Sequence, residues 1–205
     1  MAEAGQACVD FKGTGLSILE ISHRSAEFKP VLEEAEALTR ELLSMGDDYG
    51  VLFLQGGASS QFFMAAMNLL GSGETAAYVD TGAWSTNAVK EAKLFGNVDI
   101  VASSKDKNYT YIPKDYELAS NTKYLHITSN NTVRGTQFAS FPDVNVPLVC
   151  DSSSDIFSRN IDISKFGLIY AGAQKNMGPA GTALVIVKKD LLGKLERQIP
   201  TMLDY

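Results

Sequence analysis

The chain has 205 residues, of which 45% are hydrophobic and 20% are charged, and it carries a formal net charge of −6 at pH 7. This composition is typical of soluble globular proteins, and the length suffices for one large domain with a substantial core. An acidic chain without a cluster of lysine and arginine argues against nucleic acid or an anionic membrane as a partner.

The first ten residues show neither the basic region nor the apolar core of a secretion signal, and no apolar run reaches the roughly 18 residues that a membrane span needs. We expect residues 1–10 to be poorly structured or to be a truncated helix. Cys8 and Cys150 do not form a metal-ligand spacing, so no metal site is predicted. We expect two free thiols in a reducing cytoplasm and a cytoplasmic protein.

Apolar periodicity predicts the secondary structure of the remaining chain. Residues 17–25 are expected to be a short extended segment, and residues 105–113 to be irregular. Helices are predicted at 27–43, at 61–70, at 85–95 with Ser85 as the N-cap, and at 190–196. Short buried strands are predicted at 51–54, 75–79, 98–101, 123–128, 147–151, 167–170 and 181–187.

Buried strands that alternate with helices predict an α/β fold, with a mostly parallel sheet of seven strands covered by helices on both faces. Ligands of such sheets bind beyond the carboxyl ends of the strands. Polar or glycine-rich segments follow five of the predicted strands, so we expect one site formed by several loops.

A lysine and an aspartate at two of these strand ends suggest the chemistry of the site. Lys175 lies in a turn between two apolar strands, where partial burial would make its amine a usable nucleophile toward carbonyls. Asp151 ends another apolar strand, 24 residues before Lys175. An amine that binds an aldehyde and an acid that faces a pyridinium nitrogen are the protein groups that pyridoxal phosphate requires. An exposed loop lysine and a helix-capping aspartate remain the alternative.

Four further segments carry possible ligand groups. Residues 56–61 (Gly-Gly-Ala-Ser-Ser-Gln) join a strand to a helix, which suits a phosphate or a plain helix cap. Trp84, the only tryptophan, could stack on a flat cofactor or pack in the core. Residues 130–132 (Asn-Asn-Thr) offer amides and a hydroxyl, or a simple turn. His23 and Arg24 could bind a carboxylate or phosphate, or open a helix, whereas His126 is expected to be a satisfied structural histidine.

Taken together and in this order, five motifs resemble those of the phosphoserine aminotransferase family, which belongs to the fold type I pyridoxal phosphate enzymes. The motifs are Ile-Ser-His-Arg-Ser at 21–25, Gly-Gly with Gln-Phe at 56–62, Thr-Gly-Ala-Trp-Ser at 81–85, Cys-Asp-Ser-Ser at 150–153 and Ala-Gly-Ala-Gln-Lys-Asn at 171–176. The resemblance covers about residues 11–205, which are expected to be the cofactor-binding large domain.

The resemblance implies a role for each matching residue. Lys175 is similar to the Schiff-base lysine, Asp151 to the partner of the pyridine nitrogen, and Trp84 to the stacking ring. The matching phosphate-binding positions are Ala58, Ser59 and Gln174; Thr132 matches the hydroxyl near the phenolic oxygen, and His23 and Arg24 match substrate-binding positions. The implied reaction transfers an amino group from glutamate to 3-phosphohydroxypyruvate in serine biosynthesis, with a further role in pyridoxine biosynthesis for some members. A homodimer is implied as well.

The sequence also departs from the family pattern. The family usually has Asn-Glu-Thr where this chain has Asn130-Asn131-Thr132, so a local hydrogen bond is expected to differ. Family members begin with a glycine- and proline-rich segment and continue into a smaller C-terminal domain. We therefore expect this chain to be a large domain that is incomplete at both ends and without the small domain.

Other functions are compatible with the same residues. One alternative is a different fold type I enzyme, such as a cysteine desulfurase or an alanine–glyoxylate aminotransferase. Another is a truncated chain that binds pyridoxal phosphate without catalysis.

Overall fold

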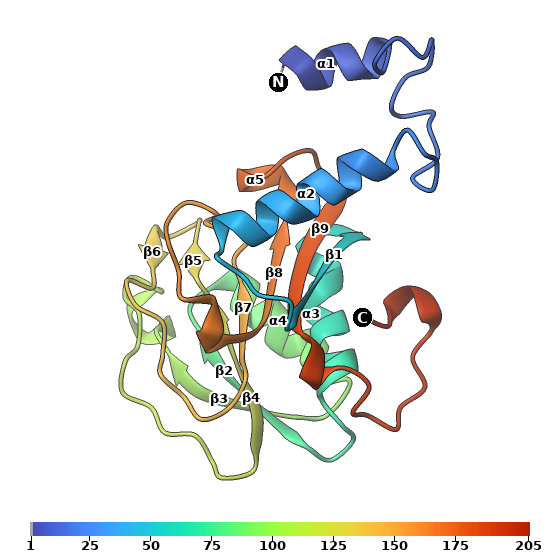
Figure 1. Ribbon diagram of the computed structural model, residues 1–205. Helices are drawn as coiled ribbons and strands as arrows, with labels where there is room; N and C mark the ends of the chain where they lie inside the picture. Colours follow the sequence, from blue (N-terminus) through green and yellow to red (C-terminus); the bar gives the residue numbers. More distant parts are fainter. Residues whose placement is uncertain (1) are drawn as a thin grey trace. The chain divides into compact units, whose positions relative to one another are not determined.

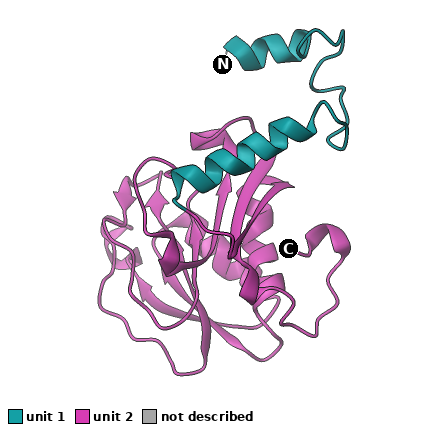
Figure 2. Cartoon of the chain, viewed as in Figure 1, with its two compact units in different colours: residues 1–44 teal, residues 45–205 magenta. Residues whose placement is uncertain are grey.

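The computed structural model describes residues 2–205, and the chain divides into two compact units, residues 1–44 and 45–205 (Figure 2). The first unit holds α1 (Ala2–Val9) and α2 (Lys29–Leu42). Residues 2–9 are therefore a helix, the second of the two expectations, and not a poorly structured segment. Alanine at positions 2, 4 and 7 favours this outcome, because alanine has the highest helix propensity. The sequence predicted a boundary after residue 10, whereas the two compact units meet after residue 44.

The extended segment predicted at 17–25 is wrong, because these residues form consecutive turns. Three serine hydroxyls accept local backbone N–H groups: Ser17 from Leu19, Ser22 from Arg24 and Ser25 from Phe28. Such side-chain-to-backbone hydrogen bonds compete with extended structure.

The second unit is built on a seven-stranded sheet with the order β1-β9-β8-β7-β4-β2-β3 (Figure 1). The strands are β1 (Tyr49–Gln55), β2 (Thr75–Asp80), β3 (Asn97–Ser103), β4 (Thr122–Thr128), β7 (Leu148–Asp151), β8 (Phe166–Gly172) and β9 (Thr182–Lys188). The pairs from β3 through β8 are parallel, and only β9 runs against its two neighbours. The predicted mostly parallel sheet is confirmed.

Helices α3 (Gly57–Leu69) and α4 (Ala83–Ala92) contact each other and pack on one face of this sheet (Figure 1). Their apolar side chains join those of the central strands in one core. Members of that core that are at most 1% exposed are Ala65, Ala66, Leu70, Ala76, Tyr78, Ala88, Ala92, Tyr124, Val149, Leu168, Tyr170, Val185 and Val187. This core fixes the strand ends that carry the predicted site residues.

Some local predictions need correction. The helix predicted at 190–196 is only a 3₁₀ turn at Lys189–Leu191, because Leu192 is extended and Gly193 has a φ of +65°. The predicted turn around Lys175 contains a one-turn helix, α5 (Ala173–Asn176). Two short strands, β5 (Asn130–Asn131) and β6 (Thr136–Gln137), form a hairpin that was not predicted.

Ser85 lies at the third position of α4, where Gly82 is the N-cap, and is not itself the cap. Its hydroxyl oxygen accepts the N–H groups of Thr81 and Gly82, each over 2.9 Å. Among residues 2–205, no helix has the length and apolarity that crossing a bilayer requires.

Candidate active site

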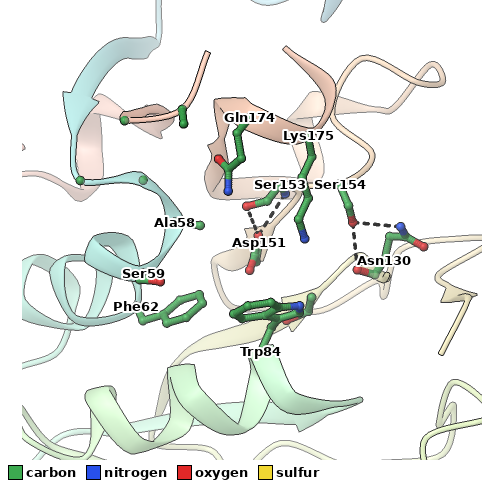
Figure 3. Close-up of a pocket in the computed structure, with 15 residues that line it drawn as sticks. Ala58, Ser59, Phe62, Trp84, Asn130, Asp151, Ser153, Ser154, Gln174 and Lys175 are labelled. Atoms are coloured by element: carbon green, nitrogen blue, oxygen red, sulfur yellow. Dashed lines mark hydrogen bonds between the residues drawn. The ribbon is translucent and has the colours of Figure 1, made fainter. Parts of the chain in front are cut away.

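A cavity of about 330 Å³ lies where β4, β7 and β8 end and α3 begins. Six of the predicted site residues line it (Figure 3): Ala58, Ser59, Trp84, Asp151, Gln174 and Lys175. They come from four segments that are far apart in sequence. These six residues therefore line one cavity, and their roles in binding or catalysis stay a prediction.

The start of α3 supplies backbone donors to the cavity. Gly56, the N-cap, has a φ of +98°, which is accessible to glycine at little cost, and no side chain caps the helix there. The Gly56 N–H donates to the carbonyl oxygen of Gly181 over 3.2 Å, which holds the loop against the start of β9. Because the first N–H groups of a helix have no intrahelical acceptor and carry partial positive charge, Gly57, Ala58 and Ser59 suit an anion.

Asp151 is 5% exposed at the end of β7. Its Oδ1 accepts hydrogen bonds from the Ser153 N–H over 3.0 Å and from the Ser153 hydroxyl over 2.6 Å. Burial raises the pKa of the Asp151 carboxyl above its ordinary value, while the Ser153 hydrogen bonds and the nearby Lys175 ammonium act in the opposite direction. The aspartate is therefore a buried acid with two fixed donors and a cation close by.

Lys175 lies on α5, directly after β8, and its side chain points from that helix toward Trp84 (Figure 3). The Nζ donates to the Thr132 hydroxyl over 3.0 Å and lies 5.2 Å from the centroid of the Trp84 ring. The residue is exposed, so the partial burial expected from the sequence is not found in this chain. Its ammonium is held by a hydroxyl and an aromatic face instead.

Trp84 is positioned by the carboxylate at the end of β2. Asp80 Oδ1 accepts the hydroxyls of Ser85 and Thr86 over 2.9 and 3.0 Å, which fixes the first turn of α4. Asp80 Oδ2 accepts the hydroxyl of Ser103 over 3.1 Å, from the end of neighbouring β3. The Trp84 side chain, 36% exposed, therefore presents its ring to the cavity from a fixed helix start.

Thr128 and Ser154 line the cavity but were not singled out from the sequence, whereas Asn130 and Phe62 belong to segments named there. Thr128 ends β4 beside Asp151, and its buried Oγ1 has no hydrogen-bond partner among the described residues. Asn130 Nδ2 donates to the Ser154 hydroxyl, which donates back to the Asn130 carbonyl oxygen (Figure 3). Phe62 completes the apolar side of the cavity. The strand-end position of Thr128 was a usable signal, whereas the Asn130–Ser154 contact joins distant residues and had none.

Other predicted residues lie elsewhere. Thr132 contacts Lys175 without lining the cavity, and His23 and Arg24 are exposed in the unit of residues 1–44, so their substrate contact stays a prediction. His126 was expected to have its hydrogen-bonding groups paired, and this holds for one of its two ring nitrogens. His126 Nε2 shares a hydrogen bond of 2.8 Å with the Tyr170 hydroxyl, while buried Nδ1 has no partner among residues 2–205.

The cysteine-desulfurase alternative can be compared with the environment of Cys150. Cys150 is fully buried, and burial raises the pKa of its thiol to about 12, which does not fit the mobile nucleophile that a cysteine desulfurase needs. Within the described residues, no group of three or more potential metal-ligating side chains is found.

Comparison with known proteins gives the family. The model of the aminotransferase class-V family matches residues 2–201. A phosphoserine aminotransferase of Flavobacterium johnsoniae is 61% identical over 204 residues, which are 99% of this chain and 57% of that protein. One of Parabacteroides distasonis is 61% identical over 199 residues, or 97% of this chain and 56% of that protein. The chain thus spans a little over half the length of these relatives.

Solved structures agree with this result. The phosphoserine aminotransferase of Bacillus circulans subsp. alkalophilus matches with a TM-score of 0.94 at 50% identity, over all of this chain and 57% of that one. The pyridoxal phosphate-bound phosphoserine aminotransferase of Trichomonas vaginalis matches with a TM-score of 0.91 at 33% identity, over all of this chain and 58% of that one. Because the family model matches nearly the whole chain, the chain belongs to the aminotransferase class-V family.

Proposed function

We propose that this chain is the cofactor-binding part of a phosphoserine aminotransferase that uses pyridoxal phosphate. The observation that carries the proposal is the meeting of Lys175, Asp151 and Trp84 around one cavity at the start of α3. The names and identities of the relatives support the same activity. We propose that residues 11–205 constitute the large domain and that residues 1–10 precede it.

The residues present fit pyridoxal phosphate. The uncapped start of α3 offers N–H groups for a phosphate, with Ala58 and Ser59 in its first turn and Gln174 nearby on the cavity wall. Thr128 leaves a buried hydroxyl without a partner on the same wall, which a bound polar ligand would satisfy. Trp84 and Phe62 supply apolar surface for a flat ring, and the volume lies in the range of small-ligand sites.

When bound, the cofactor would supply an aldehyde that condenses with amines and a ring that accepts electrons from the substrate α-carbon. The Asp151 carboxylate would accept a hydrogen bond from a ring nitrogen and stabilise positive charge there, since Ser153 fixes its orientation. Trp84 would cover one ring face. Thr132 would hold a hydroxyl beside the Lys175 amine, with which it shares a hydrogen bond of 3.0 Å.

Lys175 has two tasks in this proposal. It is the amine that attaches the cofactor, and once free it carries a proton to and from the substrate α-carbon as a general base and acid. Its position suits both tasks because Lys175 and Asp151 line the same cavity. The Lys175 ammonium also opposes the rise in the Asp151 pKa that burial causes. An exposed amine can also be reached by a substrate from outside.

For the whole protein we propose glutamate and 3-phosphohydroxypyruvate as substrates, with 2-oxoglutarate and O-phosphoserine as products. His23 and Arg24 are proposed to bind the carboxylate or phosphate of these substrates, because both side chains donate to anions. We further propose a cytoplasmic homodimer that acts in serine biosynthesis, with an additional part in pyridoxine biosynthesis. The names of the relatives support the amino-transfer activity, and the other assignments rest on the family resemblance of the motifs.

The test is an amino-transfer assay on the protein that carries this chain, with pyridoxal phosphate and glutamate present. 3-Phosphohydroxypyruvate, glyoxylate and oxaloacetate are offered as competing acceptors. We expect the highest kcat/KM with 3-phosphohydroxypyruvate as the acceptor. The Lys175→Ala variant should show no turnover with any acceptor. A preference for glyoxylate would assign a different aminotransferase activity, and cofactor binding without turnover on any acceptor would contradict a catalytic role.

A further inference from the structure

Asn131 is a buried amide that joins two loops of the site. It is 3% exposed and follows β4 by three residues. Its Nδ2 donates to the carbonyl oxygen of Thr81 over 2.6 Å, while its Oδ1 accepts the N–H groups of Val133 and Arg134 over 3.2 and 3.3 Å. One side chain thus holds the loop after β2 and shapes the turn that contains Thr132.

The close approach of these loops depends on Gly82. A Cβ atom built on Gly82 would lie 2.4 Å from Asn131 Nδ2, a separation that real side chains do not show. The glycine therefore lets the backbone of the 81–82 segment meet the amide directly. Trp84 follows two residues later, in the first turn of α4.

The two loops that Asn131 joins carry the two groups that contact the Lys175 ammonium. Thr132, its neighbour in sequence, accepts the hydrogen bond from Nζ over 3.0 Å. The Trp84 ring centroid lies 5.2 Å from the same Nζ. Any change in the spacing between the loops would change one of these contacts, because the threonine and the tryptophan move with their own loops.

We propose that Asn131 is a positioning residue that sets the spacing between Trp84 and Thr132 around Lys175. A neutral amide fits its two sets of contacts, because it can donate to a carbonyl oxygen and accept from two N–H groups at once. A carboxylate of the same shape would accept but could not donate, and would face the Thr81 oxygen with a second acceptor. The consequence for cofactor binding rests on the proposed function; the effect on the Trp84 loop does not.

The test measures the Trp84 loop in the 205-residue chain without added cofactor. Trp84 is the only tryptophan, so its fluorescence and its quenching by acrylamide report on this loop alone. We expect Asn131→Asp and Asn131→Ala to raise the quenching constant and shift the emission to the red, with unchanged far-ultraviolet circular dichroism. The matched control is Asn97→Ala on β3, which removes an amide hydrogen bond of 3.1 Å to the Gly73 carbonyl oxygen. It should leave both signals unchanged.

The second readout is pyridoxal phosphate affinity and the visible circular dichroism of the bound cofactor. Losing one buried hydrogen bond predicts about a fivefold weaker affinity for each Asn131 variant, with a weaker visible dichroic band. Unchanged Trp84 quenching in a folded Asn131→Ala chain would overturn the inference, and so would loss of the far-ultraviolet signal in both variants, because Asn131 would then support the whole fold. Failure of the proposed function alone would instead appear as no cofactor binding in any variant, with the quenching difference retained.

Discussion

The hydroxyl of Ser153 donates to Asp151 Oδ1 over 2.6 Å and accepts the N–H of Gly172 over 3.0 Å. The same side chain therefore contacts the buried acid of β7 and the end of β8, from which α5 and Lys175 continue. Ser153 fixes the acid relative to the segment that carries the lysine. It also donates toward the charged form of the carboxylate, which makes that form less costly in a buried position.

Ser153→Ala should raise the pKa of Asp151 further, because the carboxylate loses one of two donors. The chain should also lose about 1 kcal/mol of stability from the broken contacts. The pKa is followed through the side-chain carboxyl carbon of Asp151 in a nuclear magnetic resonance titration. Ser154→Ala is the control, since Ser154 is hydrogen-bonded to Asn130, and it should leave the titration of Asp151 where it is. Equal shifts in the two variants would contradict this account.

Asp151→Asn should make the cofactor-free chain more stable at pH 7. Burial raises the pKa of the Asp151 carboxyl above its ordinary value of 3.8. A carboxyl with a raised pKa contributes stability that is fully present below its unfolded pKa and is lost as pH rises through its folded pKa. The asparagine keeps an acceptor oxygen for Ser153, so the advantage of the variant should vanish toward pH 4. Urea unfolding between pH 4 and pH 8 measures this, and a pH-independent difference would refute it.

His126 should make the fold sensitive to mild acid. It stacks on Tyr78 with ring centroids 4.6 Å apart, and burial lowers its pKa from 6.5 to about 3. The unfolded chain therefore binds a proton below pH 6.5 that the folded chain does not, and stability falls as pH falls from 6.5 toward 3. The loss should be about 2 kcal/mol between pH 6.5 and pH 5.

His126→Gln should remove that slope while keeping a polar side chain beside Tyr170, although its stability at pH 7 will be lower. The neighbouring tyrosines do not interfere, because burial raises the pKa of Tyr78 and Tyr170 well above 10. His23 is the only other histidine, and His23→Gln is the control that should keep the wild-type slope. Thermal unfolding at intervals between pH 5 and pH 8 gives the comparison.

Arg197 should stabilise the C-terminal segment against the end of α3. Its guanidinium donates to the carbonyl oxygens of Met67 and Leu70 over 2.9 and 3.0 Å and to that of Phe95 over 2.9 Å. These carbonyls lie at or near the ends of α3 and α4, where acceptors lack helical partners and carry negative charge. Arg197→Ala should cost about 2 kcal/mol in chemical denaturation. Arg197→Lys keeps the charge but not the forked geometry, so its stability should lie between those of the wild-type chain and Arg197→Ala. Equal stability of all three chains would exclude a stabilising role for these hydrogen bonds.

The sequence predicted the sheet well because its strands are short apolar runs with clear boundaries. Each of the seven predicted strands overlaps an observed one, and Asp151, Trp84 and Lys175 were each assigned to a strand-end loop that lines the cavity. Strands that are buried on both faces of a sheet are continuous apolar runs, and such runs can be recognised in the local sequence.

Hydrogen bonds that apolar periodicity does not show, both local and long-range, decided what could not be predicted. The turns at 17–25 follow serine side chains that bond their own backbone, which apolar periodicity does not show. The hairpin of β5 and β6 and the Asn131 contact to Thr81 join residues up to 50 positions apart. The expected burial of Lys175 failed because the loop after β8 leaves its ammonium exposed.

The most direct test of the central claim is to find the lysine that pyridoxal phosphate modifies. The chain is incubated with pyridoxal phosphate, a visible absorbance band is recorded, borohydride fixes the adduct, and the labelled peptide is identified by mass spectrometry. The proposed site predicts one label on Lys175, with the band absent in Lys175→Ala and weakened in Asp151→Ala. A label on other lysines that persists in Lys175→Ala would contradict the assignment of this cavity as the cofactor site.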